Sequence, residues 1–239
     1  MAGSRNFLVV FNETDISTFD NRLNERKHKW INEEIVDICF ASPNIGFILL
    51  TETRVFVFSA RNQEHECLTA IQKMEDYKFS TCTSNQQSLL LAYKRPGTPI
   101  DEWHIDSWKR VTRYRSPDTC TNDEYINCLR YGSDLSKLGM TIYGSHRIRF
   151  ELRDSKMNCL QRIPVCETGC CGFISMPGAK WLLSDGHFLY VITEDGSVEI
   201  IERQSVDAAY NDTGNVTVFA DTFIVLRSRK ALYFYANNV

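Results

Sequence analysis

The stretch from residue 37 to residue 58 reads DICFASPNIGFILLTETRVFVF and holds three short apolar runs separated by turn-forming residues. The first run surrounds Cys39, the second spans residues 46–50, and the third spans residues 54–58. Valine and phenylalanine alternate in the third run, so both faces of an extended strand there would be apolar. This stretch therefore predicts three antiparallel strands, of which the last is buried on two sides.

The same arrangement recurs along the chain at a nearly constant spacing. Cys39, Cys82, Cys128 and Cys171 stand 43, 46 and 43 residues apart, and each lies in a similar short string that is followed by two further β-rich runs. One more period leads to residues 215–219, which are equally strand-like but contain no cysteine. The sequence thus contains an internal repeat, and the small cysteine side chains are expected to be reduced and buried on the first strand of each unit.

The two ends of the chain carry further strand-like runs. Residues 7–11 and 15–20 resemble the carboxyl-terminal runs 223–227 and 231–235, and both pairs read as second and third strands of a unit. We expect the two ends to pair with each other and to close a ring, because pairing would hide exposed strand edges. Counting the two partial units separately gives six units, which we favour, whereas merging them gives five.

A repeat of about 40 to 45 residues with three or four strands is typical of a β-propeller blade. One small sheet cannot bury both of its faces, but sheets that stack radially cover one another. The fold class predicted for the chain is therefore all-β, a β-propeller of six blades that forms a single domain over residues 1–239. Helices are plausible only at residues 20–34 and 69–76.

In periodicity and strand order, nearly the whole chain resembles the WD40-like and NHL-like propeller families. It departs from their motifs, because no Trp-Asp dipeptide ends the third strands and Gly186-His187 lies at the wrong place in its unit. The resemblance implies a rigid platform whose loops and axial surface bind a protein, a peptide or a nucleic acid. It also implies that a minority of such propellers are enzymes.

Composition favours a folded domain and weighs against bulk electrostatic binding. The chain is 43% hydrophobic and 12% aromatic, and its 27 basic residues are balanced by 30 acidic residues, so nucleic acid and anionic membranes are disfavoured as partners. The apolar run at residues 7–11 is too short for a signal peptide or a membrane span. A cytoplasmic or nuclear location is expected, with unused sequons at Asn12, Asn211 and Asn215.

Catalytic and metal-binding chemistry have weaker support. The cysteines between residues 159 and 171 offer one Cys-x(2–4)-Cys pair, which is too few ligands for zinc. Nucleotide-binding loops and the serine nucleophile elbow are missing, so no cofactor is predicted. The main enzyme alternative is a calcium-dependent hydrolase in which Asp37, Asn127 and Asn215 converge on the axis from the inner strands.

The function predicted from the sequence is non-enzymatic binding of a protein or peptide partner. Buried tryptophan, tyrosine and arginine dominate interface energetics, and strand alternation gathers several arginines on common faces. The candidate partner-binding residues are Trp103, Trp108, Arg113, Arg115, Tyr131, Arg147 and Arg149. Two alternatives remain open: the arginine-bearing strands could bind nucleic acid, and half or more of the aromatic residues could pack between blades.

Overall fold

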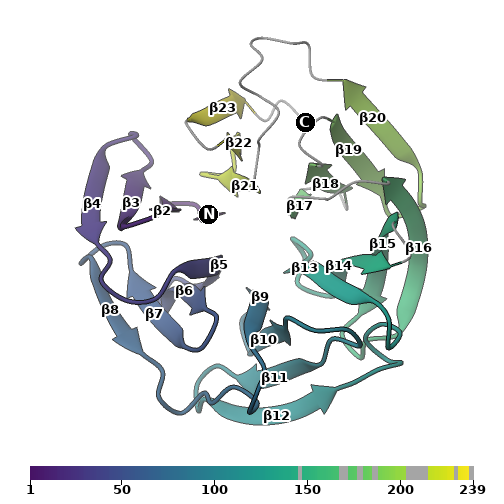
Figure 1. Ribbon diagram of the computed structural model, residues 1–239. Helices are drawn as coiled ribbons and strands as arrows, with labels where there is room; N and C mark the ends of the chain where they lie inside the picture. Colours follow the sequence, from purple (N-terminus) through teal and green to yellow (C-terminus); the bar gives the residue numbers. More distant parts are fainter. Residues whose placement is uncertain are drawn as a thin grey trace.

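The computed structural model describes residues 1–144, 147–166, 172–176, 180–184, 188–202, 215–228 and 231–236. Their regular secondary structure is entirely β-strand, and the strands form six antiparallel sheets around a common axis (Figure 1). Within these ranges, no helix is long and apolar enough to cross a membrane. The predictions of an all-β fold and of a six-bladed β-propeller are confirmed.

Each blade consists of consecutive strands, and its first strand lies nearest the axis (Figure 1). Blade 1 is formed by β1 (Ala2–Gly3), β2 (Phe7–Asn12), β3 (Asp15–Asp20) and β4 (Glu25–Lys29). Blade 2 is formed by β5 (Ile35–Ser42), β6 (Gly46–Thr51), β7 (Val55–Ser59) and β8 (Glu64–Cys67). Blade 3 is formed by β9 (Phe79–Ser84), β10 (Ser88–Tyr93), β11 (Ile100–His104) and β12 (Lys109–Tyr114).

The second half of the ring continues the pattern. Blade 4 is formed by β13 (Tyr125–Tyr131), β14 (Lys137–Gly144), β15 (Arg147–Asp154) and β16 (Cys159–Cys166). Blade 5 is formed by β17 (Gly172–Met176), β18 (Lys180–Ser184), β19 (Phe188–Thr193) and β20 (Val198–Glu202). The described strands of blade 6 are β21 (Asn215–Phe219), β22 (Phe223–Arg227) and β23 (Leu232–Ala236).

The two helices considered from the sequence are wrong. Residues 20–34 contain the strand β4, which pairs with β3, and residues 69–76 form turns and irregular structure. β4 is the outermost strand of its blade, and most of its side chains are exposed. An outer strand needs few apolar residues, so its charged composition hides the strand pattern.

The repeated cysteines occupy the position that the spacing predicted. Cys39, Cys82 and Cys128 lie on the inner strands β5, β9 and β13 and are at most 6% exposed. Cys171, the fourth member of the series, lies outside the described residues. The repeat read from these thiols is therefore the repeat of the blades.

Neighbouring blades share apolar cores, which is what makes the ring stable. On β7, Val55 packs into the core between blades 2 and 3, whereas Phe56 and Phe58 pack into the core between blades 1 and 2. This confirms a strand buried on two sides. Full burial of one such side chain contributes roughly 1.5–3 kcal/mol to stability.

The ring closes where blade 1 packs against blade 6. The Gly3 backbone N–H donates to Thr217 Oγ1 at 2.9 Å, and the Ala220 N–H donates to the Ser4 carbonyl oxygen at 3.0 Å. The described strands of the two ends belong to separate sheets, so the expected pairing of the ends within one sheet is not what these residues show. Blade 1 instead has its own inner strand, β1, whose two residues are too few to give a pattern in the sequence.

Candidate functional site

The inner strands of the blades all begin on one face of the ring. In an antiparallel blade the second strand returns to the face where the first began, and the third starts there. On this face a pocket of about 520 Å³ opens over blades 2, 3 and 4. It is lined by Val36, Glu52, Phe79, Ser80, Lys94, Tyr125, Ile126, Asn127, Tyr143 and Ile148. We call this pocket the mouth.

The lining of the mouth follows the internal repeat. Val36, Phe79 and Tyr125 each stand three residues before the cysteine of their inner strand, and all three line the pocket. Equivalent positions of blades 2, 3 and 4 converge around the axis, so these three apolar positions line one pocket. The sequence carries this signal three residues before Cys39, Cys82 and Cys128, and the cysteine spacing alone does not reveal it.

Three large apolar side chains of the mouth are open to solvent. Val36 is 38%, Tyr125 40% and Tyr143 39% exposed. Exposed apolar side chains that gather around a concave surface mark binding sites more often than scattered ones do. The mouth therefore offers apolar surface that a ligand could cover.

A buried hydroxyl lies in the wall of the same pocket. Ser80 Oγ is buried and has no hydrogen-bond partner among the described residues. A hydroxyl can both donate and accept a hydrogen bond, and a buried one that does neither costs free energy.

Charged side chains border one side of the pocket. Glu52 Oε2 accepts from Lys78 Nζ at 2.5 Å, and Glu52 Oε1 lies 3.7 Å from Lys94 Nζ. The hydrogen bond from Lys78 and the charges of both lysines lower the pKa of Glu52 despite some desolvation. Both lysine side chains are more than half exposed, so this border carries two cations for one carboxylate.

A buried ion pair fixes the inner strands beside the mouth. Asp37 on β5 and Arg130 on β13 form a bidentate pair with distances of 2.8 and 2.9 Å. Thr81 Oγ1 and the Cys82 N–H on β9 also donate to Asp37 Oδ2, at 2.7 and 2.9 Å. Burial disfavours the charge on Asp37, but the charge and hydrogen bonds of Arg130, together with the hydrogen bonds from Thr81 and Cys82, outweigh burial and lower the pKa of Asp37. The pair is therefore ionised, and it joins blades 2, 3 and 4.

The Asp37–Arg130 pair disfavours the calcium site that the sequence suggested at Asp37. Both carboxylate oxygens of Asp37 are bound to the Arg130 guanidinium, whose positive charge repels a cation at that position. Asn215 turns its side-chain oxygen to the Val216 N–H at 2.9 Å, whereas Asn127 lines the mouth. Among the described residues no group of three His, Cys, Asp or Glu side chains could hold a metal ion. Of the cysteines between residues 159 and 171, Cys170 and Cys171 lie outside the described residues.

The predicted partner-binding aromatics lie mainly in blade cores. Trp103 is 6% exposed in the core between blades 2 and 3, and Trp108 packs against the same core. Tyr131 packs against the core between blades 3 and 4. Their placement agrees with the alternative that half or more of the aromatic residues pack between blades. Their role in partner binding stays a prediction.

The predicted arginines differ in their surroundings. Arg113 forms a bidentate ion pair with the buried carboxylate of Asp101, at 2.5 and 2.8 Å. Arg115 and Arg147 are exposed, and Arg147 is opposite Gly144 in the hairpin that carries Tyr143 to the mouth. Of the predicted residues, Arg147 thus lies nearest in sequence to Tyr143.

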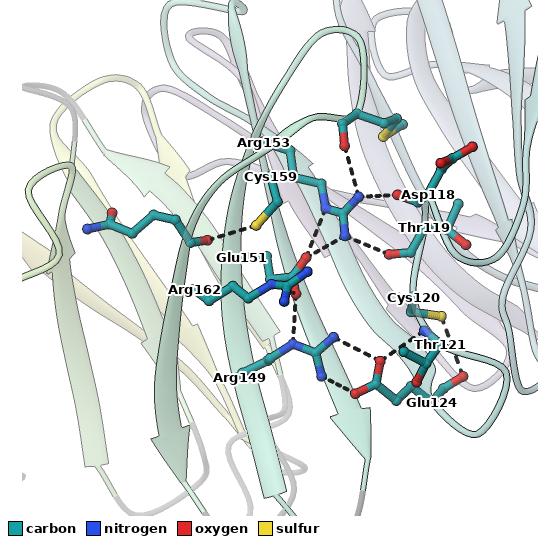
Figure 2. A network of polar contacts seen from close by, with 12 residues as sticks. Asp118, Thr119, Cys120, Thr121, Glu124, Arg149, Glu151, Arg153, Cys159 and Arg162 are labelled. Atoms are coloured by element: carbon teal, nitrogen blue, oxygen red, sulfur yellow. Dashed lines mark hydrogen bonds and ion pairs between the residues drawn. The ribbon is translucent and has the colours of Figure 1, made fainter.

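Arg149 belongs to a polar network on β15 (Figure 2). Arg149 donates to both oxygens of Glu124, with Nη2 to Oε2 at 2.8 Å, and its Nε donates to Glu151 Oε1 at 2.7 Å. Arg153 donates to Glu151 Oε2 and, at 2.8 Å, to the Thr119 carbonyl oxygen. Through these bonds β15 holds the connection between blades 3 and 4.

This network buries the arginine-bearing face of β15, which residue alternation alone would place in solvent. Ile148, Phe150 and Leu152 are buried as alternation predicts, but Glu151 and Arg153 on the other face are also at most 3% exposed. The connection between blades 3 and 4 covers that face, and alternation carries no information about such a cover. Arg149 and Arg153 are therefore neutralised by protein groups, which weakens the nucleic-acid alternative.

Comparisons with known proteins agree with this architecture. The chain is similar to a chain in the crystal structure of a nidogen/laminin complex, with a TM-score of 0.71, 10% identity, and coverage of 97% of this chain and 89% of that one. It is also similar to virginiamycin B lyase from Staphylococcus aureus, with a TM-score of 0.66, 12% identity, and coverage of 96% and 76%.

A third similar chain comes from a mitotic checkpoint complex, with a TM-score of 0.68, 9% identity, and coverage of 98% and 88%. The shared feature is the propeller fold. At these identities the likeness extends to the fold alone, and the three proteins include a lyase as well as members of protein complexes. No protein-family model matches the sequence, and no curated protein sequence is significantly similar to it.

Proposed function

We propose that this propeller is a binding module that holds a segment of a partner protein at the mouth. The observation that carries the proposal is the pocket of about 520 Å³ with exposed Val36, Tyr125 and Tyr143 at its walls. Two structurally similar chains come from protein complexes, which supports protein partners in general.

The geometry of the mouth suits recognition. Tyrosine offers a large apolar surface with a polar tip and loses little conformational entropy on binding, so it often serves as an anchor in interfaces. Tyr125 and Tyr143 come from different strands of blade 4, and the Asp37–Arg130 pair fixes β5, β9 and β13 relative to one another. A rigid site loses little free energy to ordering when a partner binds.

The proposal is tested by selecting peptides from a display library against the purified propeller. Enriched peptides should bind the Tyr125→Ala/Tyr143→Ala double variant at least about tenfold more weakly than the wild type, because anchors of this kind contribute roughly 2 kcal/mol or more. Val111→Ala is the matched control, since Val111 is 61% exposed on the outer strand β12. Equal binding to the wild type and the double variant, or no enrichment at all, would refute the proposal.

A further inference from the structure

We infer that the segment bound at the mouth is extended and combines an apolar side chain with a nearby carboxylate. This inference rests on the proposed function and adds the chemistry of the partner. It draws on three features of the mouth: its apolar wall, the unpaired hydroxyl of Ser80, and the excess of cations at its border.

The apolar wall selects the anchor. Phe79, Ile126 and Ile148 are buried behind the pocket, and Tyr125 and Tyr143 stand at its opening. A volume of about 520 Å³ lies within the usual range for ligand sites and is large enough for one or two side chains of a peptide. An aliphatic or aromatic side chain that enters this pocket moves from water into contact with apolar atoms, which favours binding.

The hydroxyl of Ser80 selects an extended backbone. An extended peptide presents backbone N–H and C=O groups beside each side chain, and these groups need partners when they are buried. Ser80 Oγ is buried in the same wall and has no hydrogen-bond partner within the described part of the chain. A backbone group next to the anchor would satisfy both itself and Ser80.

The border selects the charge. Glu52 already interacts with Lys78 and Lys94, so a basic segment would have to compete for a carboxylate that is in use. An ammonium group has three N–H donors, and Lys94 Nζ lies 3.7 Å from Glu52 Oε1, which is longer than a hydrogen bond. The Lys94 ammonium can therefore donate to a second carboxylate. Lys94 lines the pocket itself, so a carboxylate beside the apolar anchor would meet it.

The inference is tested with a matrix of short fluorescein-labelled peptides in a Gly-Ser background. The central residue is Leu, Phe or Ser, and the residue two positions later is Asp, Asn or Lys. Fluorescence anisotropy gives the affinity of each peptide at about 50 and 300 mM NaCl, because added salt screens exposed ion pairs.

We expect the apolar peptides with Asp to bind tightest, by about tenfold over their Lys counterparts at the lower salt concentration. Lys94→Gln should remove the difference between Asp and Asn, whereas Lys109→Gln on the exposed outer strand β12 should preserve it. Ser80→Ala should weaken all apolar peptides, whatever charge they carry.

The ways in which the matrix could fail are distinguishable. Apolar peptides that bind equally with Asp, Asn or Lys, yet lose affinity in the Tyr125→Ala/Tyr143→Ala variant, would overturn the inference and leave the proposed function standing. Both would be overturned if apolar peptides bound no better than their Ser counterparts, or if they bound the Tyr125→Ala/Tyr143→Ala variant as tightly as the wild type.

Discussion

At the scale of single residues, buried polar groups determine how the inner strands are held together. Asp37 and Arg130 are 93 positions apart in the chain, and their side chains are 7% and 14% exposed. Two charges taken out of water are tolerated only when they are paired and their remaining hydrogen-bond capacity is used. Here Thr81 and the backbone of β9 use that capacity.

Removal of one partner from this pair should therefore be costly. Arg130→Met is expected to lower the free energy of unfolding by about 3–5 kcal/mol, because Asp37 would remain buried and unpaired. The double variant Asp37→Asn/Arg130→Met should lose clearly less than the sum of the two single variants. Urea denaturation of the four proteins measures this coupling, and strictly additive losses would contradict it.

A histidine pair between blades 1 and 2 should make stability depend on pH. His65 Nδ1 lies 3.2 Å from His28 Nε2, and burial together with the charge of His28 lowers the pKa of His65. The unfolded chain then binds protons more readily than the folded one. The contribution of His65 is fully present above about pH 6.5 and is lost as the pH falls below it.

The measurement is the free energy of unfolding between about pH 5 and 8 for the wild type and for His65→Gln. We expect a smaller loss on acidification in the variant. Burial also lowers the pKa of the Met1 amino group, to about 5, which adds a slope of the same sign to both proteins. The difference between the two curves is therefore diagnostic, and parallel curves would count against the histidine pair.

At the scale of elements, the sequence predicted the strands well, but it did not predict which segments pack over them. Alternation gave the correct inward face of β15, and the repeat gave the correct position of β5, β9 and β13. Alternation missed that the opposite face of β15 is covered by the connection that contains Glu124. Such a cover depends on contacts between residues far apart in the chain, and local periodicity does not encode them.

Glu124→Gln tests how firmly that cover is held. The hydrogen bonds from Arg149 outweigh desolvation and lower the pKa of Glu124 to about 2. The variant should lose about 1–2 kcal/mol at neutral pH, because the pair is partly screened by solvent. Since the ionised form is favoured in the folded state, this difference should be present above about pH 4.5 and shrink as the pH falls toward 2. Thermal unfolding at several pH values measures it, and a constant difference would contradict this explanation.

At the scale of the whole molecule, periodicity predicted a ring but not how it closes or where its pocket lies. The ring closes through β1, which has two residues and so no detectable pattern. The mouth forms where Val36, Phe79 and Tyr125 converge, and only a ring of known blade order brings these repeat positions together. Residue type alone does not contain that geometry: it suggested Trp103 as a binding residue, whereas Trp103 lies in the core between blades 2 and 3.

Gly3→Ala should disturb ring closure directly. A Cβ atom at this position would lie 1.9 Å from the Val218 carbonyl oxygen on β21, so one of the two backbones would have to move. We expect a lower melting temperature and faster hydrogen exchange in β1 and β21. Gly132→Ala is the control with a smaller expected effect, because the nearest atom to its Cβ is a side-chain oxygen at 3.1 Å. Equal effects of the two variants would show that this contact does not hold the ring closed.

Docking of a partner segment at the mouth is tested most directly by hydrogen–deuterium exchange of the propeller with and without a saturating display-selected peptide. The predicted result is slower exchange at the starts of β5, β9 and β13 and in the hairpin between β14 and β15, with the outer strand β12 unchanged. Slower exchange on β12, around Arg113, with an unchanged mouth would contradict the proposal.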